Sequence, residues 1–294
     1  MPKKTLLMVK SKHTILVTGS NGQLGNELQR LQKEYPEFDF IFTDFADLDI
    51  TNKESVHKYI NRVKPDITIN CAAYTAVDDA ETNASDAMLL NGEAPGFLAD
   101  ATSQIGKKLI HISTDYVFGG SGNTPFKENS PTNPNSVYGK TKLIGEANAM
   151  KMGNAIVLRT AWLYSSFGNN FVKTIKRLAS SNDEIKVVFD QVGTPTWAHD
   201  LAQAVLAICS APSFTTGIYH YTNEGVCSWY DFALEIVNWY NYSCSVIPVE
   251  TSSFPRPANR PAYSVLNKNL IKSTYGLTIP HWKKSLQCCL KEIE

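Results

Sequence analysis

Two residues one helical turn apart have side chains that can transfer a proton together. Tyr138 and Lys142 stand at positions i and i+4, and Pro134, Asn135 and Ser136 just before them indicate a helix start. Side chains at this spacing lie on one face of a helix. A cation beside a phenol lowers its pKa from about 10, so we expect proton transfer by Tyr138 to be feasible near neutral pH. The pattern alone also occurs on ordinary amphipathic helices.

Thr114 supports the chemical interpretation of this pair. It follows the predicted strand Lys108–Ser113, and Asp115 comes directly after it. Ligands of open α/β sheets bind beyond the carboxyl ends of the strands, where Thr114 is expected to lie. A hydroxyl at this place can hold a carbonyl or alcohol oxygen beside Tyr138.

A glycine-rich loop follows the first predicted strand, Thr14–Thr18, and opens a helix. Its residues are Gly19, Ser20, Asn21, Gly22, Gln23, Leu24 and Gly25. Glycine lets the backbone approach a pyrophosphate, whose charge the free N–H groups of the helix N-terminus favour. The third glycine lets the helix lie close to the strand. A tight turn is the alternative, but the position after the first strand favours nucleotide binding.

Asp44 ends the second predicted strand, Asp39–Thr43, where a carboxylate can bind the adenosine ribose. An ordinary turn residue at a strand end is the alternative. A carboxylate here repels a 2′-phosphate, and Phe45 stands where an arginine would help to bind NADP, so this detail favours NADH. Asp49 and Ile50 are expected at the edge of the adenine.

Alternating apolar runs and helical patterns predict the fold. Further strands are predicted at Asp66–Cys71 and Ala155–Arg159, and a long helix, Ala84–Gln104, with a kink at Pro95. The alternation predicts an α/β fold, a Rossmann-type doubly wound parallel sheet with helices on both faces. After residue 168, loops rich in Pro, Ser and Asn separate helical stretches near 169–180, 198–209 and 228–240. We therefore predict a dinucleotide-binding domain at 1–168 and a smaller, interwoven, mainly substrate-binding domain at 169–294, with the chain crossing back near 187–210.

Composition excludes several classes of protein. Lys and Arg together number 28, as do Asp and Glu, so there is no basic excess that would indicate nucleic acid or an anionic membrane as a partner. No run approaches about 18 apolar residues, and Leu6–Val9 is too short for the core of a signal peptide. The six cysteines form no C-x-x-C pair and fit a reducing compartment. We expect a cytoplasmic protein.

The glycine loop, the strand-end threonine and the Tyr/Lys helix, in this order, resemble the short-chain dehydrogenase/reductase superfamily, whose extended branch acts on nucleotide-activated sugars. Longer stretches resemble the dTDP-4-dehydrorhamnose reductase family within that branch. These stretches are residues 17–25, 70–78, 113–118, 138–146, 159–164, 190–196, 260–261 and 264–266. Two residues depart from the family pattern: Gly119, where the family often has Asp, and Tyr263, where it often has Asn.

The resemblance implies reduction of the C4 keto group of dTDP-4-dehydro-L-rhamnose to give dTDP-L-rhamnose, with NADPH or NADH as cofactor. It implies that Tyr138 delivers a proton to the C4 oxygen, that Thr114 binds this oxygen, and that Lys142 binds the nicotinamide ribose and lowers the pKa of Tyr138. The cofactor groove is expected to include Ala72, Ala73 and Tyr74. The substrate side is expected to include Thr75, Val77, Asp115, Trp162, Asn170 and Arg260.

Some of these residues have structural alternatives. Trp162 is equally suited to core packing, Asn170 to capping a helix, and Arg260 either to the dTDP pyrophosphate or to a solvated charge in a Pro-rich loop. Family members can dimerise around Mg²⁺ through acidic residues, and Glu292 and Glu294 are acidic. The sequence does not support a metal site, and it leaves monomer and homodimer open.

Other functions remain as alternatives. In sugar-nucleotide 4,6-dehydratases the strand end reads Thr-Asp-Glu, whereas Tyr116 follows Thr114 and Asp115 here, which argues against dehydration. An epimerase that oxidises and re-reduces C4 would keep the same Tyr and Lys. A non-catalytic NADP-binding regulatory subunit, like the one associated with methionine adenosyltransferase, also resembles this family closely.

Overall fold

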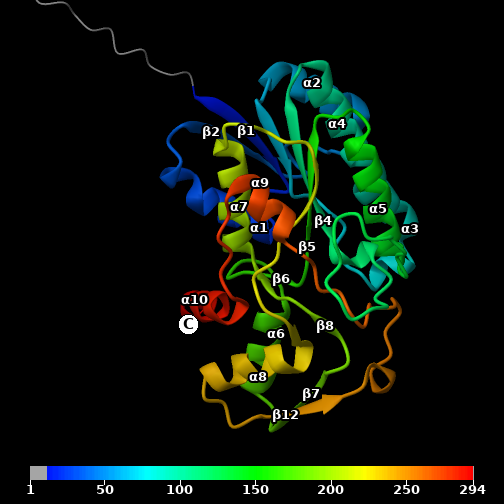
Figure 1. Cartoon of the computed structure of the whole chain (residues 1–294), viewed down its shortest axis with the longest axis vertical. Helices are drawn as coiled ribbons and strands as arrows, with labels where there is room; N and C mark the ends of the chain where they lie inside the picture. The colour runs from blue at the N-terminus through cyan, green and yellow to red at the C-terminus, as the bar shows by residue number, and fades with distance from the viewer. Residues whose placement is uncertain (1–11, 294) are drawn as a thin grey trace, which may run out of the picture.

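The computed structural model describes residues 12–293, so Glu294 and the apolar run Leu6–Val9 lie outside the described residues. Its centre is a six-stranded sheet in the order β10-β5-β4-β3-β1-β2 (Figure 1), and every pairing in it is parallel. The strands are β1 (His13–Thr18), β2 (Phe38–Thr43), β3 (Ile67–Asn70), β4 (Lys108–Thr114), β5 (Ala155–Thr160) and β10 (Gly217–His220). The predicted parallel α/β sheet is confirmed.

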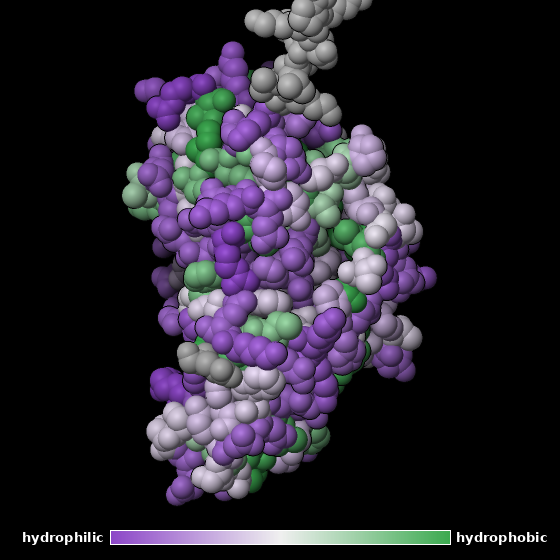
Figure 2. Space-filling model, turned by 90° about the vertical axis from the view of Figure 1, so that its left-hand side faces the viewer, coloured by the Kyte–Doolittle hydropathy of each residue, from purple (hydrophilic) through white to green (hydrophobic). Residues whose placement is uncertain are grey.

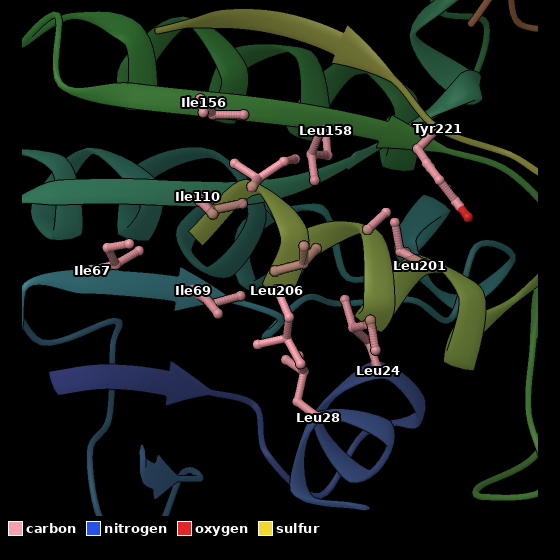
Figure 3. Packing of buried hydrophobic residues seen from close by; sticks show 14 of the residues in the cluster. Leu24, Leu28, Ile67, Ile69, Ile110, Ile156, Leu158, Leu201, Leu206 and Tyr221 are labelled. Atoms are coloured by element: carbon pink, nitrogen blue, oxygen red, sulfur yellow. The ribbon is translucent and has the colours of Figure 1, made fainter. Parts of the chain in front are cut away.

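Helices cover both faces of this sheet. On one face lie α1 (Gln23–Leu31), α7 (Ala198–Ser210) and α9 (Asn269–Tyr275); on the other lie α2 (Lys53–Val63), α4 (Ala94–Gln104) and α5 (Val137–Met150). Figure 3 shows Leu24 and Leu28 of α1 and Leu201 and Leu206 of α7 beside the apolar side chains of the sheet. Because helices cover both faces, β5 is buried at every residue, as is typical of parallel sheets.

A smaller unit lies beyond one end of the sheet. It contains α6 (Phe171–Ala179), α8 (Trp229–Trp239) and α10 (Trp282–Ile293), which share a second apolar core. Its short strand pairs are β7 (Glu184–Val188) with β12 (Ser245–Val249), β8 (Val192–Gly193) with β11 (Cys227–Ser228), and β6 (Leu163–Tyr164) with β9 (Thr196–Trp197). Single-turn elements are η1 (Gln32–Glu34), η2 (Asp79–Glu81), η4 (Asp115–Val117) and η5 (Thr251–Ser253).

The second half of the chain returns to the sheet over a longer stretch than 187–210. Helix α7 begins within that range, but β10 and α9 also pack with the first half. The sixth strand, β10, was missed in the sequence because Gly217–His220 is a four-residue segment with a glycine and a histidine and no apolar run. The predicted helices near 169–180, 198–209 and 228–240 correspond to α6, α7 and α8.

The predicted helix Ala84–Gln104 is helical throughout, but its irregular part precedes Pro95, where the kink was expected. The structure has α3 (Ala84–Ala87), a π-helical stretch, η3 (Met88–Glu93), and then α4, which has Pro95 in its first turn. The physical reason is that Pro95 has no N–H to donate to the carbonyl of Asn91, so a regular α-helix cannot continue through this segment.

No helix among residues 12–293 is long and apolar enough to cross a membrane. The face in Figure 2 is mainly hydrophilic, and its hydrophobic residues form small separate groups. All six cysteines lie in the described part of the chain, and none of them forms a disulfide.

Helix α5 and the η3 segment approach each other at Gly145. This contact predicts that a larger residue there lowers the free energy of unfolding. A Cβ on Gly145 would lie 2.0 Å from the carbonyl oxygen of Asn91, so Gly145→Ala forces the two elements apart. We expect a loss of about 1–3 kcal/mol in the free energy of unfolding, measured by urea denaturation. In an open helix the same change stabilises by about 1 kcal/mol, so an unchanged or higher stability contradicts the prediction. Ala147→Gly, at an exposed position of the same helix, measures helix propensity alone.

Candidate active site

A cavity of about 860 Å³ lies where the carboxyl ends of the central strands meet the smaller unit. Most of the predicted site residues line it. They are Gly19, Gly22, Gln23, Leu24, Gly25, Asp44, Asp49, Ile50, Ala72, Ala73, Thr75, Val77, Thr114, Asp115, Tyr138, Lys142, Trp162 and Asn170. The structure therefore brings the glycine loop, the strand-end threonine and the Tyr/Lys helix to one cavity, in which a cofactor and a second ligand can meet.

The glycine loop has a backbone geometry that other residues would disturb. Gly19 has φ +66°, and a Cβ there would lie 2.6 Å from the backbone of Ala72. A Cβ on Gly25 would lie 2.5 Å from the carbonyl oxygen of Ser20, so this glycine lets α1 lie against the loop. Gly22 is the N-cap of α1, and no side chain caps this end. The N-terminal N–H groups of α1 thus remain available for an anion, which fits a dinucleotide pyrophosphate.

Asp44 is held in place at the end of β2. Its carboxylate accepts hydrogen bonds from the backbone N–H of Asn21 at 2.9 Å and of Phe45 at 2.8 Å. The predicted cofactor residue Asn21 does not line the cavity, and its backbone N–H instead holds the carboxylate of Asp44. Phe45 lines the cavity and is 74% exposed. Lys142 is the one cationic side chain among the described cavity-lining residues, so this end of the cavity has an anion and no cation.

The start of α5 places Tyr138 against the end of β4. Ser136 caps the helix by accepting from the N–H of Gly139 at 3.1 Å. A Cβ on Gly139 would lie 2.3 Å from the carbonyl oxygen of Tyr116, so this glycine permits the close contact. The rings of Tyr116 and Tyr138 meet edge to face, with centroids 5.5 Å apart. Thr114 donates to Asp115 Oδ1 at 3.1 Å.

The pKa values differ from the sequence expectation. We expected Lys142 to lower the pKa of Tyr138, but burial raises the pKa of this phenol to about 12, and a hydrogen bond with Thr114 opposes the rise. The ammonium of Lys142 donates to the carbonyl oxygen of Ile112 at 2.6 Å. Burial lowers the pKa of Lys142 to about 8. Tyr138 therefore keeps its proton at neutral pH in this state of the protein. Burial also raises the pKa of Asp115 to about 6.

Besides Asn21, two other predicted residues do not line the cavity. The backbone N–H of Tyr74 donates to Asn91 Oδ1 at 2.8 Å, and the side-chain amide of Asn91 donates to the carbonyl oxygen of Tyr74 at 3.0 Å. Arg260 was expected at a pyrophosphate, but both of its terminal nitrogens bond the carboxylate of Asp78 at 2.9 Å. This ion pair lowers the pKa of Asp78. The guanidinium thus links the Pro-rich loop to the segment after β3.

Trp162 is both packed and open to the cavity. Its φ of +48° is unusual for a bulky residue, and its ring stacks on Trp229 with centroids 3.6 Å apart and an interplanar angle of 7°. A Cβ on Gly193 would lie 2.6 Å from this indole, so glycine makes room for the ring. Sequence reasoning missed Trp229, which lines the cavity from the first turn of α8 and has no motif around it.

Asn170 combines the two roles that the sequence left open. It caps α6 by accepting from the N–H of Lys173 at 3.2 Å, and its amide donates to Gln23 Oε1 at 3.1 Å. Because Asn170 lines the cavity as well, the cap joins the glycine loop to the smaller unit.

Sequence reasoning also missed a buried group behind the cavity. Glu146 lies one turn after Lys142 and bonds Ser113 and Arg159. The available signal was Arg159 itself, a charged residue that ends an otherwise apolar stretch, AIVLR, where burial demands a partner.

Residues 12–293 contain no group of three or more His, Cys, Asp and Glu side chains arranged to hold a metal ion. Of the two acidic residues considered for Mg²⁺, Glu292 bonds Arg30 at 2.7 Å and Ser166 at 3.0 Å, and Glu294 lies outside the described residues.

Comparison with known proteins identifies the family. Residues 13–294 match the family model described as RmlD substrate binding domain. A dTDP-4-dehydrorhamnose reductase from Burkholderia thailandensis is 40% identical, over 95% of this chain and 98% of that protein. The solved structure of a dTDP-4-dehydrorhamnose reductase from Clostridium acetobutylicum is 45% identical, with a TM-score of 0.90, and covers 95% of this chain and 98% of its own. The solved structure of the dTDP-4-dehydrorhamnose reductase from Bacillus anthracis in complex with NADP is 38% identical, with a TM-score of 0.91. It covers 96% of this chain and 99% of its own. The chain belongs to the dTDP-4-dehydrorhamnose reductase family.

Proposed function

We propose that this protein reduces the C4 keto group of dTDP-4-dehydro-L-rhamnose to give dTDP-L-rhamnose, with NADH or NADPH as the reductant. The observation that carries the proposal is the common cavity, in which the glycine loop, Thr114, Tyr138 and Lys142 meet at the carboxyl end of the sheet. Family membership supports the substrate class, a nucleotide-activated 4-keto-6-deoxy sugar.

The cofactor-binding part of the cavity is formed by the first half of the chain. Gly19, Gly22 and Gly25 leave room for the pyrophosphate at the N-terminus of α1. Asp44 is positioned for the adenosine ribose, and Asp49 and Ile50 for the adenine edge, while Ala72 and Ala73 form the wall of the groove. When bound, the reduced nicotinamide supplies the hydride for the sugar C4.

Tyr138 is the proton donor in this proposal. Reduction creates an alkoxide at the C4 oxygen, and the reaction then needs a group that still holds its proton at neutral pH. The raised pKa of Tyr138 meets this need. Thr114 binds the reacting oxygen, and Lys142 binds the nicotinamide ribose and stabilises the phenolate that proton transfer leaves on Tyr138. The cation therefore acts on the product of the proton transfer and does not ionise the phenol beforehand.

We assign the substrate side of the cavity to the segments that follow β3, β4 and β5, together with Asn170 and Trp229 from the second half of the chain. Thr75, Val77, Asp115, Trp162 and Asn170 are its proposed contacts, and Trp229 joins them as the ring behind Trp162. Arg260 is left out because the carboxylate of Asp78 occupies its guanidinium.

Replacement of Tyr138 tests the proton donor. Tyr138→Phe removes the hydroxyl but keeps the ring that packs against Tyr116. We expect the rate of NAD(P)H oxidation with dTDP-4-dehydrorhamnose to fall by about 10²–10⁴-fold, while NADH binding measured by fluorescence is retained. If wild-type protein binds the cofactor but does not oxidise it with this substrate, the reductase proposal fails. An epimerase or a regulatory subunit then becomes the better explanation.

Replacement of Phe45 tests the choice between NADH and NADPH. The ribose end of the cavity holds Asp44 and no cation among its described residues, so a 2′-phosphate lacks a counter-charge. Phe45→Arg supplies a guanidinium at an exposed position beside Asp44. We expect the ratio of kcat/KM for NADPH to that for NADH to rise about tenfold, because one charge-assisted hydrogen bond contributes roughly 1.5–3 kcal/mol. Phe45→Leu is the matched control for loss of the ring, and an equal rise in this variant contradicts the assignment.

A further inference from the structure

A third polar residue continues the line of Tyr138 and Lys142 along α5. Glu146 stands four residues after Lys142 and eight after Tyr138, so the three side chains share one face of the helix. The carboxylate is 2% exposed, which is unusual for a glutamate and requires partners. It points away from solvent toward the ends of β4 and β5, where its partners lie.

Three hydrogen bonds fix this carboxylate. Ser113 donates from its hydroxyl to Oε1 at 2.5 Å, and Arg159 donates from Nε to Oε1 at 2.9 Å and from Nη2 to Oε2 at 2.7 Å. Ser113 immediately precedes Thr114 on β4, and Arg159 lies beside it on β5, as its register partner. One carboxylate thus joins the strand end that carries Thr114 to the helix that carries Tyr138 and Lys142. We refer to Ser113, Glu146 and Arg159 as the carboxylate clamp.

The carboxylate clamp also sets the charge balance around Lys142. Tyr138 and Glu146 face Lys142 from its own helix, Cys71 from the end of β3 and His111 from β4, while Arg159 of β5 reaches it through Glu146. Burial lowers the pKa of His111 well below its usual range, so this imidazole is neutral, and burial raises the pKa of Cys71 to about 12, so this thiol is neutral too. Among the groups that face Lys142, Glu146 is therefore the anion, and it also pairs with Arg159, which the carboxyl group of Glu128 approaches as well.

We propose that Glu146 is a positioning residue of this active site, which clamps the Thr114 strand end to the Tyr138–Lys142 helix and keeps Lys142 protonated. The inference rests on the proposed reductase function for its kinetic consequence. Its electrostatic part stands on the placement of Lys142 and Glu146 at positions i and i+4 of one helix, both 2% exposed, because a buried lysine loses its proton readily unless an anion lies nearby. The nearby anion is the reason that the Lys142 ammonium is available to a nicotinamide ribose at neutral pH.

The test compares the pH dependence of variants that separate charge from contact. Glu146→Gln keeps the shape and removes the charge, so we expect the alkaline limb of kcat to move down by about one pH unit from the value near 8 set by Lys142. Glu146→Asp restores the charge and should return the limb toward that of the wild type. Ser113→Ala removes one contact and leaves the charge, so kcat should fall severalfold with the limb unmoved.

Arg159→Gln gives a prediction of opposite sign. It removes the Arg159 cation and leaves the Glu146 carboxylate facing Lys142. Because Lys142 then keeps its proton more readily, the alkaline limb of kcat should move to higher pH. A merely structural role would lower activity in both charge variants without these opposite shifts. If Glu146→Gln folds and the alkaline limb of its kcat–pH profile stays in place, the proposal is overturned. If Glu146→Gln does not fold, the proposal is overturned when the alkaline limb of Arg159→Gln stays in place or moves to lower pH.

A binding measurement separates this inference from the proposed function. The dissociation constant of NADH is measured by fluorescence from pH 6 to 10, with no sugar nucleotide present. We expect binding to weaken as Lys142 loses its proton, at a lower pH in Glu146→Gln than in the wild type. If this transition lies at a lower pH in Glu146→Gln but the wild type reduces no dTDP-4-dehydrorhamnose, the reductase proposal fails and the role of Glu146 stands. If NADH binding has the same pH dependence in both proteins, the role of Glu146 fails whatever the substrate is.

Discussion

The contact between α5 and its neighbours is closer than ordinary side chains allow, and the active site depends on it. Cβ atoms on Gly139 and Gly145 would lie 2.3 and 2.0 Å from the carbonyl oxygens of Tyr116 and Asn91. Two glycines thus let the helix lie directly on the backbone that follows β4 and on the π-helical segment before α4. Because Tyr138 and Lys142 lie on this helix, their distance from Thr114 is set by backbone contacts, which vary less than contacts between long side chains.

This close approach has an electrostatic consequence. The helix carries Lys142 and Glu146 into a region where less than a tenth of either side chain is exposed, and β5 brings Arg159 into the same region. Burying isolated charges costs far more than a domain's net stability allows, so they persist only as a hydrogen-bonded set. The set does not have to stabilise the fold relative to apolar residues. In the role proposed for Glu146, the set keeps a cation at the cavity wall, while the phenol beside it stays protonated.

Sequence reasoning found the parts of the molecule that obey local rules. Apolar runs predicted five of the strands because a parallel sheet buries both faces. The glycine loop and the Tyr138–Lys142 pair were found from their spacing together with their order relative to the strand that ends at Thr114. The π-helical turn was missed because the kink expected at Pro95 is spread over the residues before it. Strand β10 and Trp229 were missed because partners distant in sequence place them. The ion pair of Arg260 was missed for a similar reason: the guanidinium chemistry suits a phosphate, but its partner in the structure, the carboxylate of Asp78, lies far away in sequence.

The path of the chain explains how the two sides of the cavity are kept in register. Segments of the second half return to the sheet as α7, β10 and α9, so the smaller unit is attached at several points rather than by one linker. Asn170 adds a direct link, since it caps α6 and bonds Gln23 in the glycine loop. Trp162 lies where the two units meet. Its positive φ costs about 1–3 kcal/mol of conformational free energy, and its stack on Trp229 contributes about 0.5–1.5 kcal/mol beyond the burial of the two rings. A strained residue at the wall of a cavity, held by a ring from the other unit, requires both units in one arrangement. The stack of Trp162 on Trp229 therefore fixes the two sides of the cavity relative to each other.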